Sequence, residues 1–229
     1  MTLFGNTANI KKDLLKKIES LAEIEIPRHQ LISLELAQEL AYYTGQIARE
    51  IAIFVDRKGR IRSISIGDSN TAPLLQENLR RGDSRLTGIR CVHTHPSGDS
   101  RLSRIDLEAL INGRLDCMAA LGVLEGNLQG FSVAFLQPGE SDKQFATQSY
   151  GPFPIGKLEK FPFLSLLQEA DRAIQKPSYN EVAPERERTF LVGFRERKGN
   201  LLSGAESLGE LYELAKTAGA DIAGQTLLN

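Results

Sequence analysis

Two of the three histidines in this 229-residue chain lie one residue apart, within the stretch RCVHTHPSGDSRLSRID. In an extended strand alternate side chains share a face, so His93 and His95 are expected to point the same way. Pro96 and the following Ser-Gly-Asp-Ser predict a turn, and a helix is then predicted to bring Asp106 back on its first turn. Zinc in hydrolases takes about three nitrogen or oxygen ligands and keeps an open position for water. His93, His95 and Asp106 could therefore converge on one ion and leave its fourth position for water, although two strand histidines on a solvated face are also common without a metal.

A hydrolytic site also needs a general base and a group that stabilises the developing oxyanion. Glu50 directly precedes the first predicted core strand, and it could take the proton of zinc-bound water if that strand neighbours the histidine strand. Glu39, on a helix face, and Glu77, in a polar segment, are alternatives. Ser103, at the predicted helix start, could hydrogen-bond the water or the oxyanion. Ser103-x-x-Asp106 is also an ordinary capping box, which stabilises a helix by about 0.5–2 kcal/mol without any metal.

The helices and strands that must position these residues are predicted to form one mixed α/β domain. Apolar residues at helical spacing predict helices over 9–23 and 33–49, the second with Ser33 as N-cap and Glu35 in its first turn. His29 lies between them and is expected to be a solvated loop residue. The remaining predictions are a hairpin at 51–68 turning at Asp-Arg-Lys-Gly, a strand at 85–95, a helix at 103–116, and a strand pair at 117–137 turning at Glu-Gly-Asn. Interleaved helices and strands favour a mixed sheet flanked by helices.

The rest of the chain predicts a boundary and the beginning of a second domain. Prolines and glycines make 137–156 loop-rich, and a helix at 160–175 and a polar linker at 176–188 follow. The last stretch is predicted as strand, helix and strand, with a capping box at Ser207 and Glu210 and a C-terminal cap at Gly219. We therefore expect domains at 1–150 and 186–229, joined by a helix and linker at 151–185. The final β-α-β segment is too short to close a core, so we expect the chain to be the front part of a longer polypeptide.

The histidine motif resembles the signature of the JAMM (MPN+) zinc metalloproteases and their RadC-like relatives. It consists of H-x-H-P, six residues and S-x-x-D, and it occurs without departure as HTHP, SGDSRL and SRID. The resemblance covers about residues 35–136 and implies a JAMM/MPN-like α/β fold. It implies zinc bound by His93, His95 and Asp106, with Glu50 as general base and Ser103 as stabiliser of the tetrahedral intermediate. Family members cleave peptide or isopeptide bonds, often of ubiquitin-like modifiers, and many have no known activity.

A second resemblance concerns the last part of the chain. SLGELYELAKTAGADIAG is similar to the opening of the N-terminal domain of HflX-type GTPases, which bind the large ribosomal subunit. It implies that the zinc module precedes such a GTPase, either as a peptide or isopeptide hydrolase or, alternatively, as a non-catalytic ribosome- or ligand-binding regulatory module. GPFPIGKL matches G-x-x-x-x-G-K but has Leu158 where a phosphate loop needs Ser or Thr, and Pro152 and Pro154 remove backbone donors. We therefore expect no GTP binding by this fragment.

Composition disfavours several other classes of protein, namely nucleic-acid-binding, membrane and secreted proteins. The chain is 41% hydrophobic with a formal net charge of −1, which gives no general attraction to nucleic acid or an anionic membrane surface. No apolar run approaches the roughly 20 residues of a membrane span, and the N-terminus lacks the order of a secretory signal. Cys91 and Cys117 form no CxxC pair and are expected to be buried thiols in a reducing cytoplasm.

Overall fold

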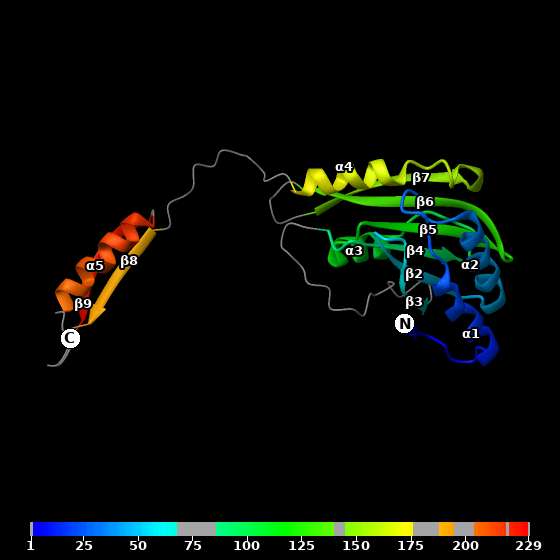
Figure 1. Ribbon diagram of the computed structural model, residues 1–229, viewed down its shortest axis with the longest axis horizontal. Coiled ribbons are helices and arrows are strands. Elements are labelled where there is room, and N and C mark those ends of the chain that lie inside the picture. Colours follow the sequence, from blue (N-terminus) through cyan, green and yellow to red (C-terminus); the bar gives the residue numbers. More distant parts are fainter. Residues whose placement is uncertain are drawn as a thin grey trace. The chain divides into compact units, whose positions relative to one another are not determined.

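The computed structural model describes residues 2–67, 86–139, 145–175, 188–194, 204–218 and 220–228. The chain divides into two compact units, Met1–Ser178 and Tyr179–Asn229. The first contains a seven-stranded mixed sheet with helices, and the second is a two-stranded parallel sheet with a crossover helix (Figure 1). The predicted α/β fold class, with a short β-α-β segment after the main sheet, is confirmed.

The sheet of the first unit has the strand order β1-β3-β2-β4-β5-β6-β7. Its strands are β1 (Thr2–Gly5), β2 (Glu50–Asp56), β3 (Ile61–Gly67), β4 (Ile89–His95), β5 (Cys117–Leu124), β6 (Asn127–Pro138) and β7 (Phe145–Pro154). The pairs β1–β3 and β4–β5 are parallel and the others are antiparallel. Both predicted hairpins are present. The β5–β6 turn has positive φ at Glu125 (49°) and Gly126 (78°), as the favoured two-residue hairpin turn requires.

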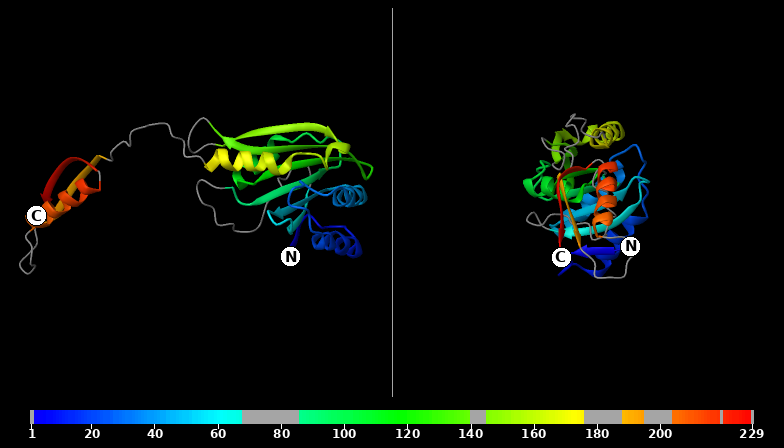
Figure 2. Two further views of the ribbon diagram at one scale, coloured as in Figure 1. Left: turned by 45° about the horizontal axis from the view of Figure 1, so that its top comes forward. Right: turned by 90° about the vertical axis from the view of Figure 1, so that its left-hand side faces the viewer.

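Helices cover both faces of this sheet and bury two separate cores. The helices are α1 (Lys12–Ser20), α2 (Leu34–Ile47), α3 (Arg104–Gly113) and α4 (Phe163–Gln175), with short 3₁₀ turns η1 (Leu21–Glu23) and η2 (Ile155–Lys157). The larger core lies under α1, α2 and α4, and Figure 2 (left) shows α4 in front of the green strands. The smaller core lies under α3 and includes Ala52, Cys91 and Met118. Because side chains alternate along a strand, the two cores use alternate residues of β2, β4 and β5.

The second helix is anchored where the sequence predicts. The Ser33 hydroxyl accepts a hydrogen bond from the backbone N–H of Leu36 (3.3 Å), and α2 ends at Ala48 in the left-handed region. Near its end the Thr44 hydroxyl lies 2.6 Å from the Thr94 hydroxyl, which also accepts from the Ile51 N–H at 2.9 Å. These buried contacts hold α2, β2 and β4 together. His29 lies in an exposed turn before α2, as expected.

Two strands of the sheet were not predicted. β1 is a four-residue edge strand that follows no alternating pattern long enough to detect. β7 occupies half of the segment predicted as loop-rich, and that prediction is wrong there. An edge strand has one unpaired side, so Pro152 and Pro154 can be accommodated there without disrupting a ladder on both sides.

The expected boundary near residue 150 falls inside β7, and α4 belongs to the first unit. Arg57, in the β2–β3 turn, makes paired contacts with Asp116 (2.6 and 3.0 Å) and with Asp171 of α4 (3.2 and 3.3 Å). Asp116 is buried and also accepts from the Gly88 N–H at 3.0 Å. Ion pairs as well as apolar contacts therefore hold α4 to the sheet.

The second unit consists of β8 (Arg188–Phe194), α5 (Gly204–Thr217) and β9 (Asp221–Leu228). Because α5 begins at Gly204, Ser207 lies inside the helix, so the predicted capping box is wrong. Ala205 and Glu206 are good helix formers, and Glu206 in the first turn suits the helix dipole, so the helix can start before Ser207. The predicted cap Gly219 and most of the linker at 176–188 lie outside the described residues.

Candidate metal centre

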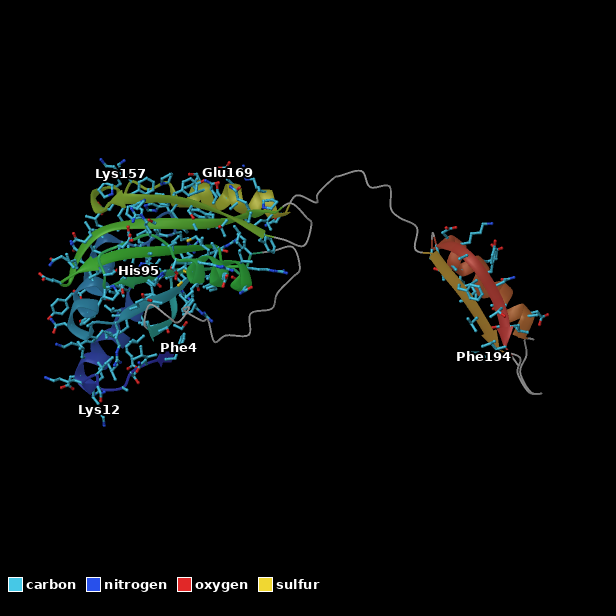
Figure 3. The ribbon with its side chains drawn as sticks, turned by 180° about the vertical axis from the view of Figure 1, so that it is seen from behind. Phe4, Lys12, His95, Lys157, Glu169 and Phe194 are labelled. Atoms are coloured by element: carbon cyan, nitrogen blue, oxygen red, sulfur yellow. The ribbon has the colours of Figure 1, made fainter. Side chains whose placement is uncertain are left out.

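The two histidines of β4 lie on one face of the sheet, as predicted. β4 pairs with β2 on one side, Ala52 opposite His93, and with β5 on the other, Ala120 opposite His93. The Nε2 atoms of His93 and His95 are 2.9 Å apart. The side chain of His93 is 1% exposed and that of His95 is 13% exposed, so solvent reaches the pair from the His95 side. His95 is labelled in Figure 3.

The first turn of α3 brings the Asp106 carboxylate close to the rings of His93 and His95. Ser103 is the N-cap, and it forms a complete capping box with Asp106. Asp106 Oδ2 accepts from the Ser103 N–H (2.7 Å) and the Ser103 hydroxyl (2.8 Å). Asp106 Oδ1 lies 3.3 Å from His93 Nε2, and Oδ2 lies 3.7 Å from His95 Nε2. The capping box therefore turns one carboxylate oxygen toward the helix start and the other toward His93.

These three residues form a group that could hold a metal ion. One ligand atom from each of His93, His95 and Asp106 lies within 4.8 Å of the others. Tetrahedral ligands with bonds of about 2.0–2.1 Å would be about 3.3–3.4 Å apart. The two Nε2 atoms are 2.9 Å apart, and the nearest Asp106 oxygen is Oδ1 for His93 (3.3 Å) and Oδ2 for His95 (3.7 Å), which is close to that spacing.

The electrostatics of the group suit a cation. Burial, followed by the neighbouring His93, lowers the pKa of His95, which favours the neutral ring that a metal requires. Burial by itself raises the pKa of Asp106, but hydrogen bonds and charge from His93 and Ser103 outweigh it and hold this pKa well below its usual range. The Asp106 carboxylate is therefore ionised, as a metal ligand must be.

The second ring nitrogens of the two histidines differ in their surroundings. His95 Nδ1 lies 2.9 Å from the backbone carbonyl of Asp99. A carbonyl only accepts, so the ring N–H donates and Nε2 is the nitrogen with the lone pair. His93 Nδ1 is buried and has no hydrogen-bond partner in the described part of the chain. His93 instead lies between two strands that present alanines beside it, Ala52 and Ala120.

Glu50 lies on the face of the sheet that carries the histidines. It is two residues before Ala52, which pairs with His93, so alternation puts the Glu50 side chain on the same face. The pairing of β2 with β4 ends at Ala52 and His93, and Glu50 lies two residues beyond it, at the end of β2 next to the histidines. Glu50 is 8% exposed. The alternative Glu39 is on α2, which covers the opposite face, and Glu77 lies outside the described residues.

Two further features of the site were not predicted from the sequence. One is the Asp99 carbonyl, since backbone groups leave no residue-specific signal. The other is Gly122, which pairs with His95 and lies against the turn that contains Asp99. A glycine in the interior of an apolar strand often marks a close approach of another backbone, so this residue could have been noticed.

Comparison with known proteins adds no assignment. No protein-family model matches the chain, and no curated protein matches it significantly. In the described residues no helix has the length and apolar character needed to cross a membrane. Cys91 and Cys117 are free and buried, on neighbouring strands. The rejected phosphate-loop match from Gly151 to Leu158 includes the end of β7 and the turn η2.

Proposed function

We propose that the first unit is a zinc-dependent hydrolase of the JAMM/MPN+ type that acts on a peptide or isopeptide carbonyl. The observation that carries this proposal is the convergence of His93, His95 and Asp106, with Glu50 on the same sheet face. Two imidazoles and one carboxylate are a ligand set suited to zinc, although iron(II) in oxygenases uses the same set. A carboxylate general base beside the ligands favours hydrolysis.

Each residue near the metal centre would have a distinct role in hydrolysis. When bound, zinc polarises a carbonyl oxygen and lowers the pKa of a coordinated water. Glu50 would accept a proton from the attacking water and return it to the leaving amine nitrogen. The Ser103 hydroxyl donates to Asp106 Oδ2 and so orients this ligand. To stabilise a tetrahedral intermediate, which is the role predicted for Ser103, the hydroxyl would have to turn away from Asp106 and toward the substrate. The partial exposure of His95 leaves one side of the site accessible to a polypeptide.

Metal analysis of the full chain, purified without chelator, tests the first step. We expect close to one equivalent of zinc. Less than about a tenth of an equivalent, with no uptake on titration, would contradict the proposal, and iron in its place would point to oxygen chemistry. Cleavage of peptide- and isopeptide-linked substrates, compared between the wild type and Glu50→Gln, tests the second step. Loss of cleavage with zinc retained would establish Glu50 as the base.

A second candidate is a non-catalytic regulatory module of a ribosome-associated HflX-type GTPase. The second unit supports this candidate because it exposes apolar side chains at alternate positions of β8, namely Phe190, Val192 and Phe194. An exposed apolar row of this kind marks an interaction surface. Co-sedimentation with large ribosomal subunits would measure this function. Binding that is unchanged by combined His93→Ala and His95→Ala substitutions would show that it does not depend on the metal centre.

A further inference from the structure

We propose that Gly122 is a positioning residue of the metal centre. Because it has no side chain, the turn at 96–100 can lie against β5 and hold the Asp99 carbonyl on the ring of His95. This inference rests on the metal site of the proposed function, and it adds a residue that contacts neither the ion nor the substrate. Its role is to orient two of the three ligands.

The space at Gly122 is filled by the backbone of the turn. Gly122 pairs with His95 across β5 and β4, at the last position of β4. A Cβ atom added to Gly122 would lie 2.3 Å from the carbonyl oxygen of Gly98 and 3.1 Å from the backbone nitrogen of Ser100. Gly122 is not in the left-handed region, so the position requires glycine for space and not for conformation. Any side chain there would displace the turn.

The turn itself is held in one arrangement. Gly98 has φ +83° and its N–H donates to the His95 carbonyl at 3.3 Å. The Asp99 carboxylate accepts from the Arg101 N–H at 3.0 Å, which orients the Asp99 peptide. Ser100 is buried against the sheet. With these contacts the Asp99 carbonyl reaches His95 Nδ1 at 2.9 Å.

This arrangement determines how two ligands are presented. The bond from Nδ1 fixes the tautomer and ring orientation of His95, and removing such outer contacts typically costs about 10–100-fold in metal affinity. The turn leads within three residues of Ser100 to Ser103, the cap that holds Asp106. A shift of the turn therefore moves both His95 and Asp106. His93 is less dependent on the turn, because β2 and β5 enclose it.

The test compares two glycine substitutions that create nearly the same clash. Gly122→Ala places Cβ 2.3 Å from the Gly98 oxygen, and Gly59→Ala places it 1.9 Å from the Ile26 oxygen, in the β2–β3 turn at the opposite end of β2 from Glu50. Gly59 also has φ +89°, so Gly59→Ala adds backbone strain and should cost at least as much stability as Gly122→Ala. Both variants of the full chain should be less stable to heat. Zinc affinity is measured by competition with a chelator, and ligand geometry by the visible absorption of bound cobalt(II). We expect Gly122→Ala to weaken zinc at least about tenfold and change the cobalt spectrum, and Gly59→Ala to change neither.

The outcomes separate this inference from the proposed function. If the wild-type chain binds neither zinc nor cobalt, the metal centre itself is wrong. If the wild type binds but Gly122→Ala binds equally with an unchanged spectrum, the positioning role is overturned and the metal centre stands. An equal loss in Gly59→Ala would overturn it too, since the effect would then follow stability alone.

If Gly122→Ala does not fold, two less destabilising variants of Asp99 test the positioning role of the turn. Asp99→Gly removes the contact to the Arg101 N–H from an exposed position, and Asp99→Asn keeps an acceptor oxygen while removing the charge. We expect Asp99→Gly to weaken zinc by about tenfold and Asp99→Asn to bind nearly as the wild type does. Wild-type affinity in Asp99→Gly would overturn the positioning role of the turn and hence of Gly122.

Discussion

Replacing Asp106 with asparagine separates the two tasks of this side chain, which are capping α3 and binding a cation. The amide oxygen of Asn can still accept from the Ser103 N–H, now 2.7 Å from Oδ2. The negative charge facing His93 is lost, and with it an anionic ligand. We therefore expect Asp106→Asn to keep the fold of the metal-free chain and to lose zinc.

The size of the effect follows from linkage. With free zinc at about a hundred times its Kd, binding stabilises the wild type by about 2.7 kcal/mol. For a unit of this size that corresponds to a rise in Tm of about 5–11 °C. If asparagine weakens zinc a hundredfold, the same zinc concentration stabilises the variant by only about 0.4 kcal/mol, a shift of about 1–2 °C.

Thermal unfolding monitored by circular dichroism, with and without zinc, measures both the metal-free Tm and the rise in Tm that zinc produces. Ser103→Ala is the complementary control, because it weakens the cap but leaves the charge of Asp106 in place. It should lower the metal-free Tm and keep a larger part of the zinc-induced rise than Asp106→Asn does, because the Ser103 N–H still holds Asp106 Oδ2 and the anionic ligand remains. An Asp106→Asn protein that keeps the wild-type rise would refute the assignment of Asp106 as a ligand. A large loss of metal-free stability would show that its charge is needed for folding.

Three further predictions concern single side chains. Glu50→Gln should retain one equivalent of zinc by metal analysis and lose hydrolysis; retained hydrolysis would exclude Glu50 as the base. Ser103→Ala should lower the free energy of unfolding by about 0.5–2 kcal/mol in denaturant titrations, the cost of an N-cap, whereas an unchanged value would contradict the capping geometry. Arg57→Ala removes two hydrogen bonds from the buried Asp116 and should cost about 1–3 kcal/mol, against at most about 1 kcal/mol for Asp171→Ala on the more exposed side of the same network. Equal losses would show that burial of Asp116 is not what matters.

Local patterns in the sequence were sufficient for the elements that carry the ligands. The alternation in β4, the turn after Pro96 and the Ser103–Asp106 cap each depend on residues close in the chain. They failed where a segment is stabilised by distant partners. β7 contains prolines and glycines but pairs with β6. The start of α5 at Gly204, before the good capping residue Ser207, is a separate error of a local rule.

The sequence by itself determined which residues could bind a cation, because strand alternation and helix capping fix the relative placement of His93, His95 and Asp106. Only the tertiary structure decided that Glu50 shares their face, since this depends on β2 pairing with β4 in one register across a gap of some 40 residues. It also decided which backbone groups orient the ligands. The Asp99 carbonyl and the space at Gly122 come from the contact of a turn with a neighbouring strand, and no local rule predicts which backbone atoms such a contact brings together.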